Sequence, residues 1–198
     1  SGHFRIELEN YFCLNLQFRK IQETTQYTSM KNPLLQPFTT KYQAAPFTEI
    51  KEEHFLPAFQ ELIKLSEKEI DEIVENQEEP TFENVIEALA FSGEKLERVS
   101  GIFFNLNSAE TNDEIQKIAQ EVSPLLTEFS AKISQNSALF EKIKKVFDDK
   151  EKYNLNDEQQ MLLNETYKGF VRSGALLNEA DKEKFKNISI ELSKKSRQ

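Results

Sequence analysis

The sequence has little of several residues that mark other classes of protein. Its 198 residues include no Trp and one Cys, with only 5 Gly and 6 Pro. A lone cysteine, Cys13, excludes a disulfide within the chain. No apolar run approaches the roughly 18–20 residues that a membrane span requires. Because 30% of the residues are charged, the scarcity of Gly and Pro favours an all-helical protein over a sheet protein.

Basic residues are also in the minority. The chain has 25 Lys and Arg against 34 Asp and Glu, which gives a formal net charge of −9 at pH 7. Nucleic acids and anionic membranes both attract a basic face. We therefore expect neither nucleic acid nor a membrane as a partner, and the acidic balance by itself identifies no other partner.

The residues that carry catalysis are nearly absent. There are two histidines, His3 and His54, and no H-E-x-x-H, G-x-x-x-x-G-K-[ST] or G-x-G-x-x-G pattern. A catalytic zinc site normally needs three protein ligands, commonly two His one turn apart plus a carboxylate. Without them we predict no catalytic residue, no cofactor site and no metal site in this chain. His54 is expected to satisfy its imidazole locally at a helix start, and Cys13 has no partner histidine.

Other side-chain groups have structural explanations. The carboxylate pairs Glu52–Glu53 and Glu78–Glu79 are expected to be solvated charges at helix ends rather than an acid and base pair. Five phenylalanines form an aromatic-rich set that we assign to the core: Phe82, Phe91, Phe103, Phe104 and Phe129.

Apolar periodicity predicts helices along most of the chain. From 80 to 112 the apolar residues recur at i, i+3 and i+4, which indicates one long helix with Thr81 as N-cap and a break at Ser92–Gly93. An earlier helix should start near Glu53 or His54. Further starts are predicted from polar residues with capping potential, at Thr111, Ser137, Asn156 and Asn178.

These elements predict an all-α fold, an antiparallel bundle of about six helices. Before them, residues 31–47 carry Pro33, Pro37 and Pro46, which predict an extended lead-in held by apolar side chains that include Leu34, Phe38 and Phe47. Residues 1–29 are interpreted as a leader or non-native extension that is poorly ordered. The helical pattern is unfinished at Gln198, so we expect the domain of residues 30–198 to be truncated there.

Several separated blocks resemble one peptidase family. They are PFTEIKEEHFLPAF at 46–59, PTFENVIEAL at 80–89, SGEKLERVSGIFFNLNSAETNDEIQ at 92–116, EQQMLLNETYKGFVRSGALL at 158–177 and IELSKKS at 190–196. Their order and spacing are similar to the N-terminal region of zinc metallopeptidases such as thimet oligopeptidase, neurolysin and oligopeptidase A. The chain looks most like the bacterial peptidyl-dipeptidase (dipeptidyl carboxypeptidase) branch of that family.

The resemblance implies a much longer parent protein, a helical ellipsoid with a deep channel. Its catalytic domain would carry H-E-x-x-H and bind zinc, and its N-terminal helices would form one wall of the channel that admits short unfolded peptides. This chain departs from the family pattern because the zinc motif is missing. We therefore expect zinc only in the parent and no peptidase activity in this chain. Short peptides and the catalytic domain are the expected partners, and the cytoplasm is the expected compartment.

Two other readings stay open. The chain could be a free-standing helical interaction module without peptidase activity, which an in-frame stop codon after Gln198 would favour. Alternatively, it could expose a surface that normally packs against the missing half, in which case it should dimerise or aggregate through an apolar patch.

Overall fold

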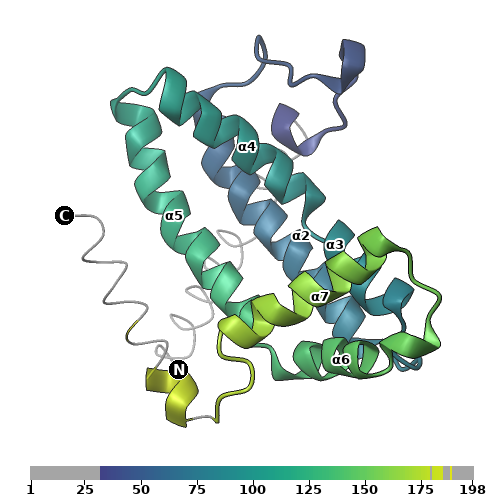
Figure 1. The fold of residues 1–198 in the computed structure, drawn as a ribbon. Helices are drawn as coiled ribbons and strands as arrows, with labels where there is room; N and C mark the ends of the chain where they lie inside the picture. The colour runs from purple at the N-terminus through teal and green to yellow at the C-terminus, as the bar shows by residue number, and fades with distance from the viewer. Residues whose placement is uncertain (1–31, 179, 185–187, 189–198) are drawn as a thin grey trace, which may run out of the picture. The chain divides into compact units, whose positions relative to one another are not determined.

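The computed structural model describes residues 32–178, 180–184 and 188. Residues 32–178 contain six α-helices, four 3₁₀ turns and one π-helix, and no strand occurs among the described residues (Figure 1). The predicted all-α class is confirmed. In this part of the chain, none of the helices combines the length and the hydropathy that a membrane span requires. The predicted leader, residues 1–29, lies outside the described residues.

The described residues form two compact units that share helices α2 and α5. One unit contains the residues up to Leu62 and Lys95–Val122, and the other contains Ile63–Glu94 and the residues from Ser123 onward. The bounds of the shared helices are Phe55–Glu75 for α2 and Asp113–Ser134 for α5. The chain therefore passes between the two units within α2, after Glu94 and within α5.

In the first unit, the lead-in has two short 3₁₀ turns, Pro33–Leu35 and Lys41–Gln43. Asn32 anchors it, because the buried side-chain amide donates to the carbonyl of His54 at 2.8 Å and its oxygen accepts from the Leu34 amide at 3.0 Å. Leu34 and Phe38 are buried as predicted, but Phe47 is 59% exposed. The prediction for Phe47 was therefore wrong. It follows Pro46 in a hydrogen-bonded turn, which leads the chain over the surface.

The core of this unit is built around Phe103 of α4, which spans Glu94–Ala109. The Phe103 ring is fully buried and lies 5.0 Å from the ring of Phe55 and 5.5 Å from that of Phe59, both on α2. A 3₁₀ turn, Glu52–His54, leads directly into α2, close to the predicted start. Edge-to-face aromatic pairs of this kind add about 0.5–1.5 kcal/mol to the hydrophobic burial.

In the second unit, the helix predicted from residue 80 begins with a π-helical turn. Thr81 caps it as predicted, since its hydroxyl accepts from the Asn84 amide at 3.2 Å. The π-helix Phe82–Glu87 continues into α3, Ala88–Phe91. The predicted break at Ser92–Gly93 is confirmed, because Gly93 adopts φ +74° and its N–H donates to the carboxylate of Glu69 at 2.8 Å.

The same unit is completed by α6, Ser137–Asp148, the 3₁₀ turn Lys150–Lys152, and α7, Asp157–Arg172. Helix α6 packs against α7 and against the π-helix (Figure 1). The buried apolar side chains of this core come from all of these helices and from α2: Ile70, Ile73, Phe82, Val85, Ile86, Leu139, Phe140, Ile143, Val146, Leu163 and Phe170.

Two of the predicted N-caps were wrong by one residue, and a third was right. The cap of α5 is Asn112 rather than Thr111, since the Asn112 side-chain oxygen accepts from the Ile115 amide at 2.9 Å. The cap of α6 is Asn136 rather than Ser137. At α7 the predicted capping box is confirmed, because Asn156 and Gln159 exchange side-chain to backbone hydrogen bonds of 2.9 and 3.0 Å.

Two members of the aromatic set assigned to the core are on the surface. Phe91 is 68% exposed and Phe104 is 36% exposed, whereas Phe82 and Phe103 are buried. Phe104 is turned by 100° from Phe103 along α4, so the two rings cannot lie on the same face of that helix. Phe91 is the last residue of α3, directly before the break at Ser92–Gly93.

Candidate binding pocket

The acidic and histidine side chains are the residues that could hold a metal ion or act as an acid or base. Among the residues that the structure describes, no three His, Cys, Asp or Glu side chains come together in a group that could hold a metal ion. His54 accepts a hydrogen bond from the Lys51 amide through Nδ1 at 3.0 Å, which confirms the predicted local role. These residues therefore do not fit a zinc ion, and no step of zinc chemistry can be assigned to them.

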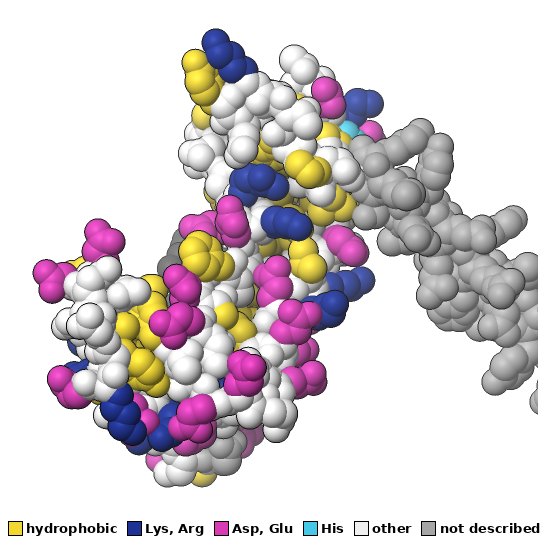
Figure 2. Space-filling view, turned by 90° about the vertical axis from the view of Figure 1, so that its right-hand side faces the viewer, with side chains coloured by type: hydrophobic (Ala, Val, Ile, Leu, Met, Phe, Trp, Pro, Cys, Tyr) yellow, Lys and Arg dark blue, Asp and Glu magenta, His cyan; other side chains and the backbone are white. Residues whose placement is uncertain are grey.

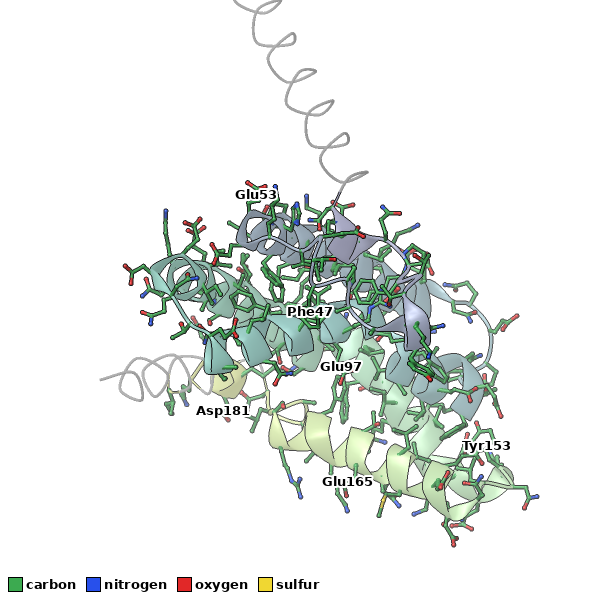
Figure 3. All side chains as sticks on the ribbon, turned by 90° about the horizontal axis from the view of Figure 1, so that it is seen from above. Phe47, Glu53, Glu97, Tyr153, Glu165 and Asp181 are labelled. Carbon is green, nitrogen blue, oxygen red and sulfur yellow. The ribbon has the colours of Figure 1, made fainter. Side chains whose placement is uncertain are left out.

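The two carboxylate pairs are at the surface, as predicted. Glu53 (Figure 3) is exposed and lies 3.8 Å from Lys51, while Glu52 accepts from the Asn112 side-chain amide at 2.6 Å. Glu78 is exposed, and exposed Glu79 lies 3.4 Å from Lys145. Exposed ion pairs of this kind contribute little to stability. Neither pair has the buried, desolvated surroundings that would tune a carboxyl for acid–base work.

A small pocket lies between the turn after α6 and the first half of α7. Its volume is about 120 Å³, and seven residues line it: Lys150, Glu151, Tyr153, Leu155, Gln160, Leu163 and Asn164. Figure 3 shows Tyr153 beside the end of α7 at which that helix begins. The sequence analysis assigned a site role to none of these seven residues, so it missed this pocket.

The pocket walls are held in place by contacts on both sides. The Tyr153 hydroxyl donates to the carbonyl of Pro80 at 3.0 Å, and partial burial raises the pKa of this phenol. Gln160 donates its side-chain amide to the carbonyl of Leu155 at 2.9 Å, which fixes the loop against α7. Leu163, between Gln160 and Asn164 on one face of α7, is buried and forms the apolar wall.

Lysine and aspartate side chains organise the turn next to this pocket. Asp149 accepts from Lys145 at 2.7 Å and pairs with Lys152 at 2.8 Å. These two ammonium groups, Lys145 first, hold the pKa of the Asp149 carboxyl below its usual value. Lys150 lies over the ring of Phe147, with Nζ 4.9 Å from the ring centroid. That ring in turn stacks on Tyr167 at a centroid distance of 4.0 Å.

Elsewhere, several large apolar side chains of the described residues are exposed. Figure 2 shows hydrophobic side chains in separate groups among acidic ones on the face in view. The most exposed large apolar side chains in the described residues are Tyr42 at 88%, Phe91 and Met161 at 68%, and Ile188 at 65%. Scattered exposed apolar residues are normal for proteins and do not by themselves indicate a binding site.

Comparison with known proteins identifies the family of this chain. The family described as "Neurolysin/Thimet oligopeptidase, N-terminal domain" matches residues 59–182. The chain belongs to this family. The match includes α2 from Phe59 onward, α3 to α7 and every residue that lines the pocket, so the predicted resemblance is confirmed.

Individual relatives of this N-terminal domain carry peptidase names. The dipeptidyl carboxypeptidases of Salmonella typhimurium and Escherichia coli are each 38% identical to it over 160 residues, which is 81% of the chain. Oligopeptidase A of Escherichia coli is 27% identical over 164 residues, 83% of the chain. The chain spans about a quarter of the length of these relatives, since the alignments cover 24% of each.

Proposed function

We propose that this chain is the substrate-channel domain of a zinc metallopeptidase that hydrolyses short unfolded peptides, and that the chain has no peptidase activity by itself. The observation that carries the proposal is the 38% identity to dipeptidyl carboxypeptidases over 160 residues. The name of these relatives makes removal of dipeptides from peptide C-termini the reaction to test first.

In this proposal the domain contributes a wall of the channel and the zinc ligands come from the rest of a longer polypeptide. The lack of a metal-binding group among the described residues supports that division of roles. It also means that the domain would act by admitting peptides and excluding folded proteins. Short peptides and the catalytic domain of the same polypeptide would then be its two partners.

The test compares two proteins from one gene. The 198-residue chain and the product of the complete reading frame would be incubated with N-acetylated peptides of four to ten residues that keep a free C-terminal carboxylate, with and without a zinc chelator. We expect dipeptide release by the longer protein only, abolished by the chelator and restored by zinc. Hydrolysis by the 198-residue chain that the chelator inhibits would refute the inactivity of the chain.

A free-standing helical interaction module without peptidase activity is the second candidate, which the lack of a zinc motif in this sequence leaves open. A reading frame that stops directly after Gln198 would support this module. Continuation through several hundred residues to H-E-x-x-H with a later glutamate would support the peptidase domain. Sedimentation over a wide concentration range would show whether exposed apolar groups make the chain self-associate.

A further inference from the structure

The second half of helix α4 turns an uncharged face outward. Residues 101–109 contain no Asp, Glu, Lys or Arg, although 30% of the whole chain is charged. One side of the helix here, opposite the buried Val99 and Phe103, is exposed. The exposed residues on that side are spaced i, i+3, i+4 and i+7 and form the outer face of α4: Gly101, Phe104, Asn105 and Ser108.

The polar side chains of the outer face bend back onto their own helix. The Asn105 side-chain amide donates to the carbonyl of Gly101 at 2.8 Å, and the Ser108 hydroxyl donates to the carbonyl of Phe104 at 2.9 Å. These hydrogen bonds lower the cost of removing the two side chains from water. The exposed side of α7 is different, since it carries charged groups that are expensive to bury: Glu158, Glu165, Lys168 and Arg172.

Glycine is a costly residue at position 101. It is less stable than alanine in a helix interior, and a Cβ there would meet nothing within 4 Å among the described residues. The backbone at Gly101 is helical, so no left-handed turn requires a glycine. Neither the local conformation nor close packing within the described part of the chain therefore explains this residue.

An exposed aromatic ring lies one turn further along the same face. Phe104 is 36% exposed, and its ring packs edge-on against that of the buried Phe103 at a centroid distance of 5.2 Å. The backbone left bare by Gly101 allows the backbone of another segment to approach closely, and the Phe104 ring offers that segment an apolar contact. The cores of protein interfaces are likewise depleted in charged residues and enriched in aromatic ones.

The length of the relatives points to what covers this face. The alignments cover only 24% of each dipeptidyl carboxypeptidase, so most of such a polypeptide lies outside this domain. Interfaces between domains of one chain bury about 600–1,500 Å². We propose that the outer face of α4 is a docking surface for the remaining part of the longer polypeptide, which places an uncharged segment over Gly101 and an apolar side chain against Phe104. This inference rests on the proposed function, because the occupant belongs to the same polypeptide.

The test measures the accessibility of this face in two proteins from one gene, the 198-residue chain and the product of the complete reading frame. Asn105→Cys places a thiol on the outer face of α4. Gln116→Cys is the matched control, since it replaces another exposed amide in the same compact unit, on α5 beside Asp113 and Lys117. Each protein is treated with a maleimide, and peptide mass spectrometry follows the modification of each site separately. Ser108→Cys provides a second thiol on the face if Asn105→Cys fails to fold.

We expect different labelling of the two sites. The thiol of Asn105→Cys should react at least about tenfold more slowly in the complete protein than in the 198-residue chain, because buried thiols are inert. The thiol of Gln116→Cys should react at the same rate in both. Equal rates in both proteins for the thiols on the outer face would overturn the proposal, even if the complete protein hydrolyses peptides. Protection in a complete protein that hydrolyses no peptide would support the docking surface and refute the peptidase function.

A charge on the same face gives an independent readout. Gly101→Lys should not lower the urea midpoint of the 198-residue chain, since lysine is a better helix former than glycine. In the complete protein it buries an unpaired ammonium group, and the thermal midpoint should fall by about 4 °C or more. Gly169→Lys adds the same side chain among the charged residues of α7 and should change neither protein much. An unchanged thermal midpoint for Gly101→Lys would count against the covered face.

Two further outcomes concern the occupant. If the outer face becomes protected in the 198-residue chain alone as its concentration rises, a second copy covers it and the proposal is overturned. A reading frame that stops directly after Gln198 would also overturn it, since no further polypeptide would then exist to cover the face.

Discussion

The break before α4 predicts opposite effects for two glycine-to-alanine substitutions. Gly93 has φ +74°, a region that costs an L-residue with a side chain roughly 1–2 kcal/mol. A Cβ there would lie 3.4 Å from Ser66 Oγ, an ordinary contact that adds no clash. Alanine also stiffens the unfolded chain, which offsets about 0.4–1 kcal/mol. We therefore expect Gly93→Ala to lower the free energy of unfolding by about 1 kcal/mol.

Gly169 provides the matched control in the same compact unit. It lies inside α7, and a Cβ at this position would meet nothing within 4 Å. Glycine in a helix interior is less stable than alanine by roughly 0.5–1 kcal/mol. Gly169→Ala should therefore raise the free energy of unfolding by about that amount, although the two substitutions add the same methyl group.

Urea unfolding followed by the helical circular dichroism signal measures both effects. With a slope of about 2 kcal/mol per molar urea, the midpoint should fall by about 0.5 M for Gly93→Ala and rise by about 0.3 M for Gly169→Ala. The slopes should not change, because neither substitution alters the surface exposed on unfolding. A midpoint that rises for Gly93→Ala would refute the left-handed backbone at this position.

Three further predictions concern the caps, the core and pH. Asn112→Ala removes the N-cap of α5 and should lower the free energy of unfolding by about 1 kcal/mol, whereas Thr111→Ala should change it little. Equal losses for the two variants in urea unfolding would indicate that Thr111 also caps the helix. Phe103→Ala should cost about 3–5 kcal/mol because this ring is fully buried, while Phe91→Ala should change the midpoint little; a large loss for Phe91→Ala would contradict its exposure. Lys145 and Lys152 hold the pKa of Asp149 below its usual value in the folded protein. The contribution of Asp149 to the free energy of unfolding is therefore fully present above the unfolded pKa of about 3.9. It is lost as the pH falls through the lower folded pKa. The stability difference between the unsubstituted chain and Asp149→Asn should therefore be constant from pH 7 to 5 and shrink below pH 4; a difference that stays constant to pH 2 would argue against these ion pairs.

The sequence predicted the helices well where local signals were unambiguous. The break at Ser92–Gly93 followed from a glycine inside an apolar stripe, and the box at Asn156 from residues three positions apart. The caps at Thr111 and Ser137 failed because an asparagine lies next to each, and local chemistry ranks such neighbours as nearly equal. At Asn112 the choice coincides with a hydrogen bond to Glu52, a residue 60 positions earlier that no local pattern contains.

The pocket could not be predicted for a related reason. Lys150, Glu151 and Tyr153 belong to a short turn with no motif, and Gln160 and Asn164 look like ordinary polar residues on an exposed helix face. The hydrogen bonds from Tyr153 to Pro80 and from Gln160 to Leu155 help to bring these groups together, and no local pattern contains the first of them. Sequence reasoning did identify the family, because the blocks that resemble the peptidases extend over most of the chain.

The way α2 and α5 are shared has a consequence for engineering. Each compact unit is assembled from two stretches that are interrupted in the sequence by a stretch of the other unit. No contiguous gene segment therefore encodes either unit without part of the other. Shortened versions of this protein should preserve residues 32–178 together, and a single unit could be isolated only by rejoining its two stretches with a new linker.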